Sequence, residues 1–277
     1  MLSLPFPAEQ ERILWRNIFR DVKANGKFNA PRGKLIIEVQ DYHYQLPAYV
    51  RFPSLTPRKL KTDYIKAETL WYLKGDPYDL SIQKYSNIWK NIVLRGRLNS
   101  NYGQAFFRRG GMNWCIQELG HDKDSRRACI TILGSEECHL KSDTLDVPCT
   151  AYLNFRIRED FLNMSVHMRS QDAVFGMGND APAFSFIHEM LLNQLRFTKY
   201  PDLQLGTYHH TSDSFHVYER HFPMLEELIA EDVTLDQIAV PRISDYSEVD
   251  FMIYELTNGK EPKPEYEFAR WLLTKSE

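Results

Sequence analysis

The amino-acid sequence predicts an α+β fold in a single domain that spans residues 1–277. Segments with apolar residues at helical spacing are interleaved with strand-like segments, without the regular strand–helix–strand rhythm of a parallel α/β sheet. No linker rich in glycine, serine or proline divides the chain. Because 43% of the residues are hydrophobic, one large core is expected.

The N-terminal half predicts two helices with a strand between them. Residues 9–26 carry apolar side chains at helical spacing and finish on an Asn-Gly pair, a common helix end. Residues 34–46 alternate between apolar and polar side chains, as a strand does. Residues 63–75 return to helical spacing and stop at Gly75.

The C-terminal half predicts mostly strands around one further helix. Residues 126–133 and 150–170 are β-rich, with a turn near Glu159 and Asp160. Residues 181–197 form an amphipathic pattern typical of a helix, and 203–221 again resemble a strand. From Val240 onward the sequence is polar, and we expect irregular structure there.

Charge and cysteine usage exclude several classes of protein. The net charge is −3, which argues against a broad surface that binds nucleic acid directly, although a local basic pocket for a phosphate remains open. No apolar segment reaches the ~18 residues of a membrane span, and the N-terminus does not resemble a signal peptide. The four cysteines show no framework spacing, so free thiols in the cytoplasm are expected: Cys115, Cys129, Cys138 and Cys149.

Cys149 is the first candidate for chemistry, because it follows a proline at the opening of a strand-like segment. A lone cysteine is more often a small buried hydrophobic residue than a nucleophile. The nucleophilic alternative requires a thiolate, which nearby positive charge would stabilise. Arg169 and the pair Arg126-Arg127 are the available cations; such pairs are commonly solvated, but this one precedes an apolar strand and could hold a phosphate.

Three further residues occupy positions that suit a binding site. Glu68 lies among apolar neighbours on an expected helix, where a carboxylate either pairs or transfers protons. His216 and Tyr218 share one side of a strand, so they point into one pocket or form a structural pair. No phosphate-loop, dinucleotide-binding or zinc-protease motif is present, and adjacent His209 and His210 point to opposite faces, so no metal is expected.

Five segments, in this order, resemble the thymidylate synthase superfamily along nearly the whole chain. They are "FPSLTPRKLKTDYIKAETLWYLKGD", "DSRR", "VPCT", "RSQD" and "FHVY". The resemblance implies a large mixed sheet packed against helices and a homodimer formed sheet to sheet. It also implies that 5,10-methylenetetrahydrofolate is the co-substrate and that no metal takes part.

The resemblance also implies roles for individual residues. Cys149 would be the nucleophile, and Glu68 would organise proton transfers through water. The phosphate and sugar of the nucleotide would be held by Arg126 and Arg127 from across the dimer interface, and by Arg169, Ser170, His216, Tyr218, Tyr102 and Arg32. The folate would be held by Asp172, Trp89 and Gly176.

Two positions depart from true thymidylate synthases and are similar to the phage deoxycytidylate hydroxymethylases. Thr150 stands where those synthases have histidine, and Asp180 stands where they have the asparagine that contacts uracil. An ionised Asp180 would face the O4 lone pairs of uracil, at a cost of roughly 1–3 kcal/mol. An asparagine could flip its amide to match cytosine, but cytosine is a poor acceptor of the nucleophile until N3 receives a proton, which a carboxyl group can supply and an amide cannot. The resemblance therefore implies dCMP as substrate and Asp180 as a catalytic residue.

The product implied by the resemblance is 5-hydroxymethyl-dCMP, released together with tetrahydrofolate. Thymidylate synthases end in a short apolar tail that excludes water, and the ending "KPEYEFARWLLTKSE" lacks that pattern, although "ARWLL" could form a different lid. A dCMP methyltransferase that releases dihydrofolate remains an alternative, as does a dUMP- or CMP-specific member. A catalytically silent nucleotide- or RNA-binding regulator and a structural dimer protein are further alternatives from other classes.

Overall fold

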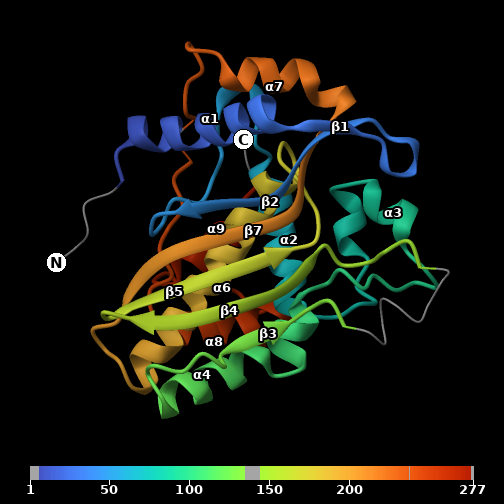
Figure 1. The fold of residues 1–277 in the computed structure, drawn as a ribbon. Helices are drawn as coiled ribbons and strands as arrows, with labels where there is room; N and C mark the ends of the chain where they lie inside the picture. The colour runs from blue at the N-terminus through green and yellow to red at the C-terminus, as the bar shows by residue number, and fades with distance from the viewer. Residues whose placement is uncertain (1–5, 135–143, 237, 276–277) are drawn as a thin grey trace.

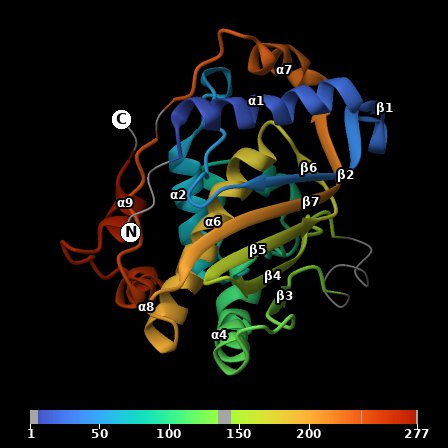
Figure 2. The same cartoon turned by 60° about the vertical axis from the view of Figure 1, so that its left-hand side comes forward.

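A computed structural model describes residues 6–134, 144–236 and 238–275 of the chain. One mixed sheet runs through the molecule, and helices pack against it (Figures 1 and 2). The predicted α+β class and the expected mixed sheet packed against helices are confirmed. Cys138 lies outside the described residues.

The sheet has the strand order β1-β2-β7-β5-β4-β3, and the short β6 pairs with β7 beside this path. β2 and β7 are antiparallel, β5 and β7 are parallel, and β4 is antiparallel to both β5 and β3. The strands are β1 Lys27–Asn29, β2 Ile36–Leu46, β3 Cys129–Thr131, β4 Thr150–Arg158, β5 Phe161–Met168, β6 Gln171–Asp172 and β7 Gln204–Tyr218. The hairpin between β4 and β5 turns at Glu159 and Asp160, which both have positive φ, as predicted.

The helices cover one face of the sheet and its upper end, as Figure 1 shows. The long α6 lies behind β5 and β7, with α2 beside it, and α1 and α7 pack together near β2. The helices are α1 Ala8–Asn25, α2 Thr62–Lys74, α3 Ile88–Ile92, α4 Gly111–His121, α6 Gly176–Thr198, α7 Phe222–Ile229, α8 Tyr246–Tyr254 and α9 Glu267–Leu273. The predicted end of α2 is confirmed, because Gly75 caps it in the left-handed conformation.

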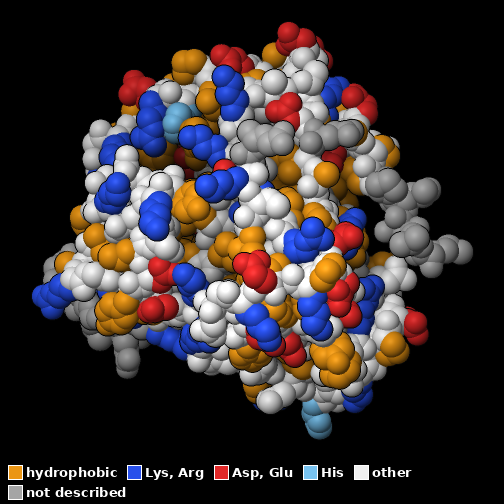
Figure 3. Space-filling model, turned by 180° about the vertical axis from the view of Figure 1, so that it is seen from behind, with side chains coloured by type: hydrophobic (Ala, Val, Ile, Leu, Met, Phe, Trp, Pro, Cys, Tyr) orange, Lys and Arg blue, Asp and Glu red, His pale blue; other side chains and the backbone are white. Residues whose placement is uncertain are grey.

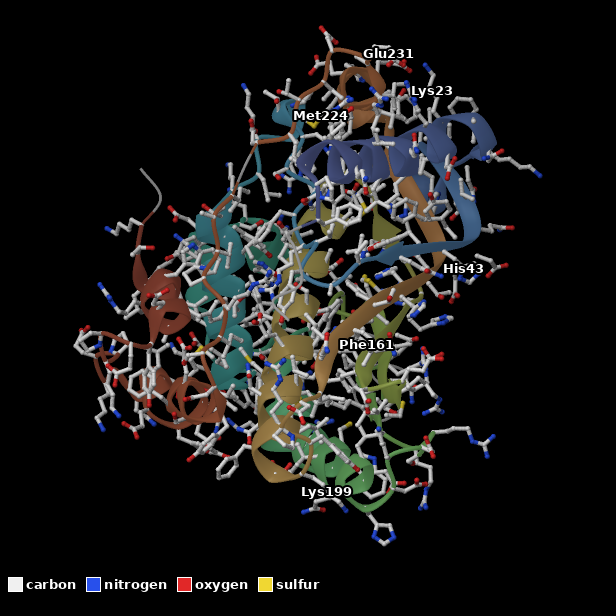
Figure 4. All side chains as sticks on the ribbon, turned by 90° about the vertical axis from the view of Figure 1, so that its left-hand side faces the viewer. Lys23, His43, Phe161, Lys199, Met224 and Glu231 are labelled. Carbon is white, nitrogen blue, oxygen red and sulfur yellow. The ribbon has the colours of Figure 1, made fainter. Side chains whose placement is uncertain are left out.

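Among the residues that the structure describes, no helix covers the opposite face of the sheet over β4, β5 and β7 (Figures 1 and 2). Burial alternates along β5, where Leu162, Met164 and Val166 are buried on the helical side and the residues between them are half-buried. Figure 4 shows the sheet from the side, with His43 on the face turned away from α2. The open face is polar, and Arg156 on it donates to the hydroxyl of Ser165.

Two predictions about local structure are wrong. The region after Val240 was expected to be irregular, but it forms α8 and α9; buried residues such as Phe251 and Phe268 attach these helices to the core. α6 begins at Gly176 and not near Ala181, so the segment that contains Gly176 and Gly178 forms its first turn. Tertiary packing explains the earlier start, because Arg58 lies against this turn and a Cβ at Gly178 would be 2.9 Å from its Nη2.

Candidate active site

The candidate site residues come from the strand ends and helices on one side of the sheet. Cys149 immediately precedes β4, Arg169 follows β5, and Asp180 lies in the first turns of α6. Figure 3 views the molecule from behind and shows a hollow at its upper left, bordered by Lys and Arg side chains with an acidic group inside. This is the side on which β1 and α3 lie in Figure 1. Such a basic rim suits an anionic ligand.

Cys149 is held in place by its backbone and faces a cation. Its N–H donates to the hydroxyl of Tyr102 at 3.3 Å, and its carbonyl accepts from the N–H of Arg169 at 2.8 Å. The guanidinium of Arg169 lies 3.7 Å from Sγ and donates to the carbonyls of Val147 and Pro148. The ring of Tyr102 is stacked on Tyr72, which fixes its position.

Burial and the charge of Arg169 have opposite effects on the pKa of the Cys149 thiol. Burial raises the pKa of Cys149, and the charges of Arg169 and Arg32 lower it. The carboxyls of Asp180 and Asp146 raise it further. In the free protein the side chain is therefore a thiol that Arg169 prepares for ionisation, and an additional positive charge or a base would complete its activation.

Glu68 lies on α2 and has one partnered and one free carboxyl oxygen. Tyr64, one helical turn earlier, donates to Oε1 at 2.9 Å and accepts from the indole N–H of Trp89 at 3.1 Å. Within the described residues Oε2 is buried without a hydrogen bond. Burial, with the charge of Asp180 as a second cause, raises the pKa of Glu68 to about 8. An unpartnered, protonated carboxyl oxygen is suited to hold a water or ligand atom and to exchange a proton with it.

Asp180 has a similarly perturbed carboxyl. Burial raises its pKa to about 7, a hydrogen bond from Gln171 lowers it, and the charge of Asp172 raises it. The amide of Gln171 donates to Oδ2 at 3.0 Å. A carboxylate near a helix N-terminus is ordinarily stabilised by the helix dipole, so burial outweighs the dipole here. Near neutral pH this side chain is present in both protonation states.

His216 and Tyr218 of β7 lie on the same side of the strand, as predicted. Their rings make an edge-to-face contact with centroids 4.9 Å apart. The pKa of Tyr218 is raised by burial first and lowered by the charge of Arg32, which places the exposed Arg32 near this end of the strand. β6 pairs with β7 in the register Asp172 to His216, so Asp172 lies beside the same group.

The expected folate side combines a carboxyl, a glycine and aromatic rings. A Cβ at Gly176 would lie 3.5 Å from Cβ of Asp172 and 3.6 Å from Oδ2 of Asp180, so the three residues adjoin. The guanidinium of Arg58 lies 4.5 Å from the ring centre of Phe175, which is 36% exposed. These groups, with Trp89, fit a flat aromatic ligand that carries negative charge, as a reduced folate does. No structural observation assigns a contact to Ser170.

The pair Arg126-Arg127 is not brought to Cys149 within one chain. The carbonyl of Arg126 accepts from Asn154, five residues along β4 from Cys149, which is a distance of roughly 16 Å for a strand. Both side chains are exposed, and Arg127 lies 3.7 Å from Glu118. If these arginines contact the phosphate, they must therefore come from another chain.

Sequence reasoning missed several residues that the structure joins to the site. Tyr64 could have been found, because it lies four residues before Glu68 and hence on the same helix face. Gln171 precedes Asp172 in the quoted "RSQD", but only the fold shows that its amide meets Asp180. Arg58 is the third; no local pattern indicates that a residue of the segment before α2 would cover the start of α6.

Comparisons with known proteins agree with this geometry. Residues 14–265 match the thymidylate synthase family. The deoxycytidylate 5-hydroxymethyltransferase of Enterobacteria phage T4 is 30% identical over 175 residues, which are 60% of this chain and 71% of the phage protein. The deoxyuridylate hydroxymethyltransferase of Bacillus phage SP01 is 27% identical over 263 residues, which are 88% of this chain and 67% of that protein.

Proposed function

The chain belongs to the thymidylate synthase family, whose reaction transfers a one-carbon unit to a pyrimidine nucleotide, and on this premise we propose that it converts dCMP to 5-hydroxymethyl-dCMP. The observation that carries the proposal is the carboxyl of Asp180. Its pKa, raised by burial to about 7, allows it to be a proton donor at neutral pH.

Cytosine and uracil differ in what they offer a neighbouring carboxyl. Cytosine accepts at N3 and donates from its 4-amino group, whereas uracil donates at N3 and accepts at O4. A protonated Asp180 can donate to N3 of cytosine, and its other oxygen can accept from the amino group. The ionised form would repel O4 of uracil. Mismatched polar groups in a buried site cost roughly 1–3 kcal/mol, so this residue favours cytosine.

The mechanism follows from the positions of the remaining side chains. Cys149 attacks C6 of the pyrimidine, aided by Arg169, while Asp180 protonates N3 and so draws electrons away from C6. C5 becomes nucleophilic and takes up the one-carbon unit that 5,10-methylenetetrahydrofolate supplies. Glu68 removes the C5 proton through a water held at Oε2, and the electron pair of that C–H bond expels tetrahydrofolate to leave an exocyclic methylene. Glu68 then directs a water to this methylene, and N3 returns its proton to Asp180. Loss of Cys149 restores the ring.

Water, in place of hydride, as the final reactant is supported by two observations. The relatives named above are both hydroxymethyltransferases, in agreement with this product. The segment "ARWLL" forms part of α9, where Trp271 packs against Phe186 and the ammonium of Lys66 lies over its ring. These contacts pack the C-terminal helix against α2 and α6 as part of the core.

Two alternatives remain within the family. Hydroxymethylation of dUMP is favoured by the relative from phage SP01, which matches more of the chain than the phage T4 protein does. Formation of 5-methyl-dCMP would share every step up to the exocyclic methylene. The carboxyl of Asp180 argues against dUMP as the substrate, and the hydroxymethyltransferase relatives argue against 5-methyl-dCMP as the product.

A homodimer is part of the proposal. The open polar face of the sheet offers a surface for a second copy (Figure 1). The second copy would supply Arg126 and Arg127 to the phosphate that Arg169 approaches from within the chain.

The test is an assay of product and folate together. Purified protein, dCMP and 5,10-methylenetetrahydrofolate should give a nucleotide heavier by CH2O, with no absorbance from dihydrofolate. A nucleotide heavier by CH2, with stoichiometric dihydrofolate, would make the protein a methyltransferase. Parallel reactions with dUMP measure the base preference, and Asp180→Asn should shift this preference toward dUMP. A ratio of specificity constants within twofold of wild type would refute the role of Asp180.

A further inference from the structure

Gln171 is a buried polar residue to which the proposed reaction gives no role. It lies on β6 with only 2% of its surface exposed. Its amide nitrogen donates to Oδ2 of Asp180 at 3.0 Å and to the sulfur of Met168 at 3.3 Å. Its amide oxygen accepts from the hydroxyl of Tyr44 at 3.4 Å. Acceptors surround the nitrogen and a donor faces the oxygen, so the direction of the amide is determined.

A chain of buried hydroxyls holds Gln171 in this orientation. The hydroxyl of Tyr44 is hydrogen-bonded to that of Tyr208, and the hydroxyl oxygen of Tyr208 lies 2.8 Å from Nδ1 of His210. Burial lowers the pKa of His210 to about 3, so the ring is neutral and the chain carries no charge near neutral pH. The ring of Tyr44 stacks on His210 with centroids 4.6 Å apart. β2, β7 and β6 thus together fix one amide N–H on the carboxyl of Asp180.

The two oxygens of Asp180 consequently have different surroundings. Oδ2 accepts from Gln171 and adjoins Gly176, where a Cβ would be 3.6 Å away. Oδ1 makes no hydrogen bond within the described part of the chain. An oxygen that already accepts an N–H bond is the less favourable place for the acidic proton, because the bond is stronger to an unprotonated oxygen.

We propose that Gln171 is a positioning residue for specificity, which keeps Oδ2 of Asp180 as the acceptor and directs the acidic proton to Oδ1. The carboxyl then meets the pyrimidine as a donor at N3 and selects cytosine over uracil. The inference rests on the proposed function and deepens it. With the proton on Oδ1, cytosine is matched at N3, whereas uracil presents a second donor there. Without Gln171 the proton can occupy either oxygen, and the second arrangement suits uracil.

Other titratable groups around Asp180 do not supply this asymmetry. The groups that interact with its charge are Glu68, Tyr64 and Tyr72 of α2, Asp172 of β6, Tyr44 of β2, Tyr208 of β7, and Tyr102 and Cys149 in the adjoining segments. All are neutral or acidic. The hydrogen bond from Gln171 is the described interaction that opposes burial and lowers the pKa of Asp180.

Gln171→Leu tests the proposal, with Gln194→Leu as a matched control. Gln194 lies on α6 far from the site and also donates from its amide to a carboxylate, Asp250, at 2.7 Å. Gln171→Leu should reduce the ratio of kcat/KM for dCMP to kcat/KM for dUMP by roughly tenfold, the usual scale of one buried hydrogen bond. The pH at which kcat/KM for dCMP declines should move upward, because the interaction that lowers the pKa of Asp180 is gone. Gln194→Leu should change neither quantity.

A binding measurement gives a readout that does not depend on turnover. Saturating dCMP and saturating dUMP should raise the Tm of the wild type by different amounts at pH 6 and pH 8. In Gln171→Leu the two nucleotides should raise the Tm equally. Tyr44→Phe frees the amide without removing it and should give a smaller loss of selectivity. If Gln171→Leu does not fold, Gln171→Glu and Tyr44→Phe carry the same test.

The outcomes separate the two proposals. An unchanged dCMP-to-dUMP ratio in folded Gln171→Leu, while Asp180→Asn does alter the ratio, would overturn the positioning role and leave the proposed function intact. A wild-type enzyme that prefers dUMP would refute the proposed substrate and the positioning role with it. A lowered ratio together with the upward pH shift would support both.

Discussion

Replacing Glu68 by glutamine should stabilise the free protein at alkaline pH while removing its activity. The carboxyl has an ordinary pKa of 4.5, which burial raises to about 8 in the folded protein. A group whose pKa is raised by folding contributes stability below the unfolded pKa, and this contribution is lost as the pH rises to the folded pKa. From pH 5 to pH 8 wild type should therefore lose roughly 3 kcal/mol that the glutamine variant keeps.

That difference converts to a change in melting temperature. For a chain of 277 residues, an unfolding entropy of about 2.1 cal/mol/K per residue makes 3 kcal/mol equivalent to about 5 °C. The amide oxygen of the variant can still accept from Tyr64, so that contact is preserved. Calorimetry of both proteins at pH 5 and pH 8 measures the effect. kcat should fall at least about a hundredfold, because an amide cannot transfer the proton.

Glu248→Gln is the matched control, since Glu248 is also fully buried. Its two oxygens accept backbone N–H bonds from Ala269 and Ser244 at 2.9 and 2.7 Å. An amide there would oppose one N–H with another, so this variant should melt lower at both pH values. If the difference in Tm between Glu68→Gln and wild type changes by less than 1 °C from pH 5 to pH 8, Glu68 ionises freely, and its role as a proton carrier loses its physical basis.

Three other experiments test the remaining roles. Cys149→Ser should abolish turnover and retain dCMP binding, because a serine hydroxyl does not ionise near neutral pH; more than about 1% residual activity would exclude Cys149 as nucleophile. Tyr64→Phe removes the hydrogen bond that lowers the pKa of Glu68, so the alkaline limb of the kcat profile should move upward with KM little changed, and an unmoved limb would contradict this. Mixing an Arg126→Ala/Arg127→Ala chain with the Cys149→Ser chain should restore some activity, since one pocket of the heterodimer is complete; no recovery in verified heterodimers would exclude phosphate binding across subunits.

The sequence predicted the longer strands and the three longest helices, α1, α2 and α6, because their signals are local. Glycine stops such as Gly75 and the alternation along β5 need no tertiary information. The start of α6 did need it: Pro182 is typical of a first helical turn, but here it is the seventh helical residue, and Arg58 fixes the earlier turn. α8 and α9 were missed for a related reason: both helices are short, and their apolar residues pack against the distant helices α6 and α2.

The candidate site likewise has features that the sequence indicates and features that only the fold shows. Cys149 and Glu68 were candidates from their sequence context, and the resemblance implied roles for them and for Asp180; the structure adds how the pKa of each is shifted by its neighbours. Those neighbours lie close in the chain, four residues away for Glu68 and nine for Asp180, but they differ in how they are brought together. Gln171 on β6 meets Asp180 on α6 through tertiary contact, whereas Tyr64 meets Glu68 through helix periodicity alone. Of these two contacts, only the one set by helix periodicity can be predicted from a sequence.

The two carboxyls are coupled in a way that gives the reaction an order. Asp180, with a pKa raised by burial to about 7, releases its proton before Glu68, whose pKa burial raises to about 8. The raised pKa of Glu68 already includes the negative charge of Asp180 as its second cause, so an Asp180 that has given its proton to N3 of the base keeps the pKa of Glu68 raised. On the proposed mechanism, we expect Glu68 to stay protonated while Cys149 adds to the ring. It would become a base only when N3 returns the proton to Asp180, the stage at which C5 must lose its own proton. Coupling between the carboxyls would then delay proton removal at C5 until the one-carbon unit is in place.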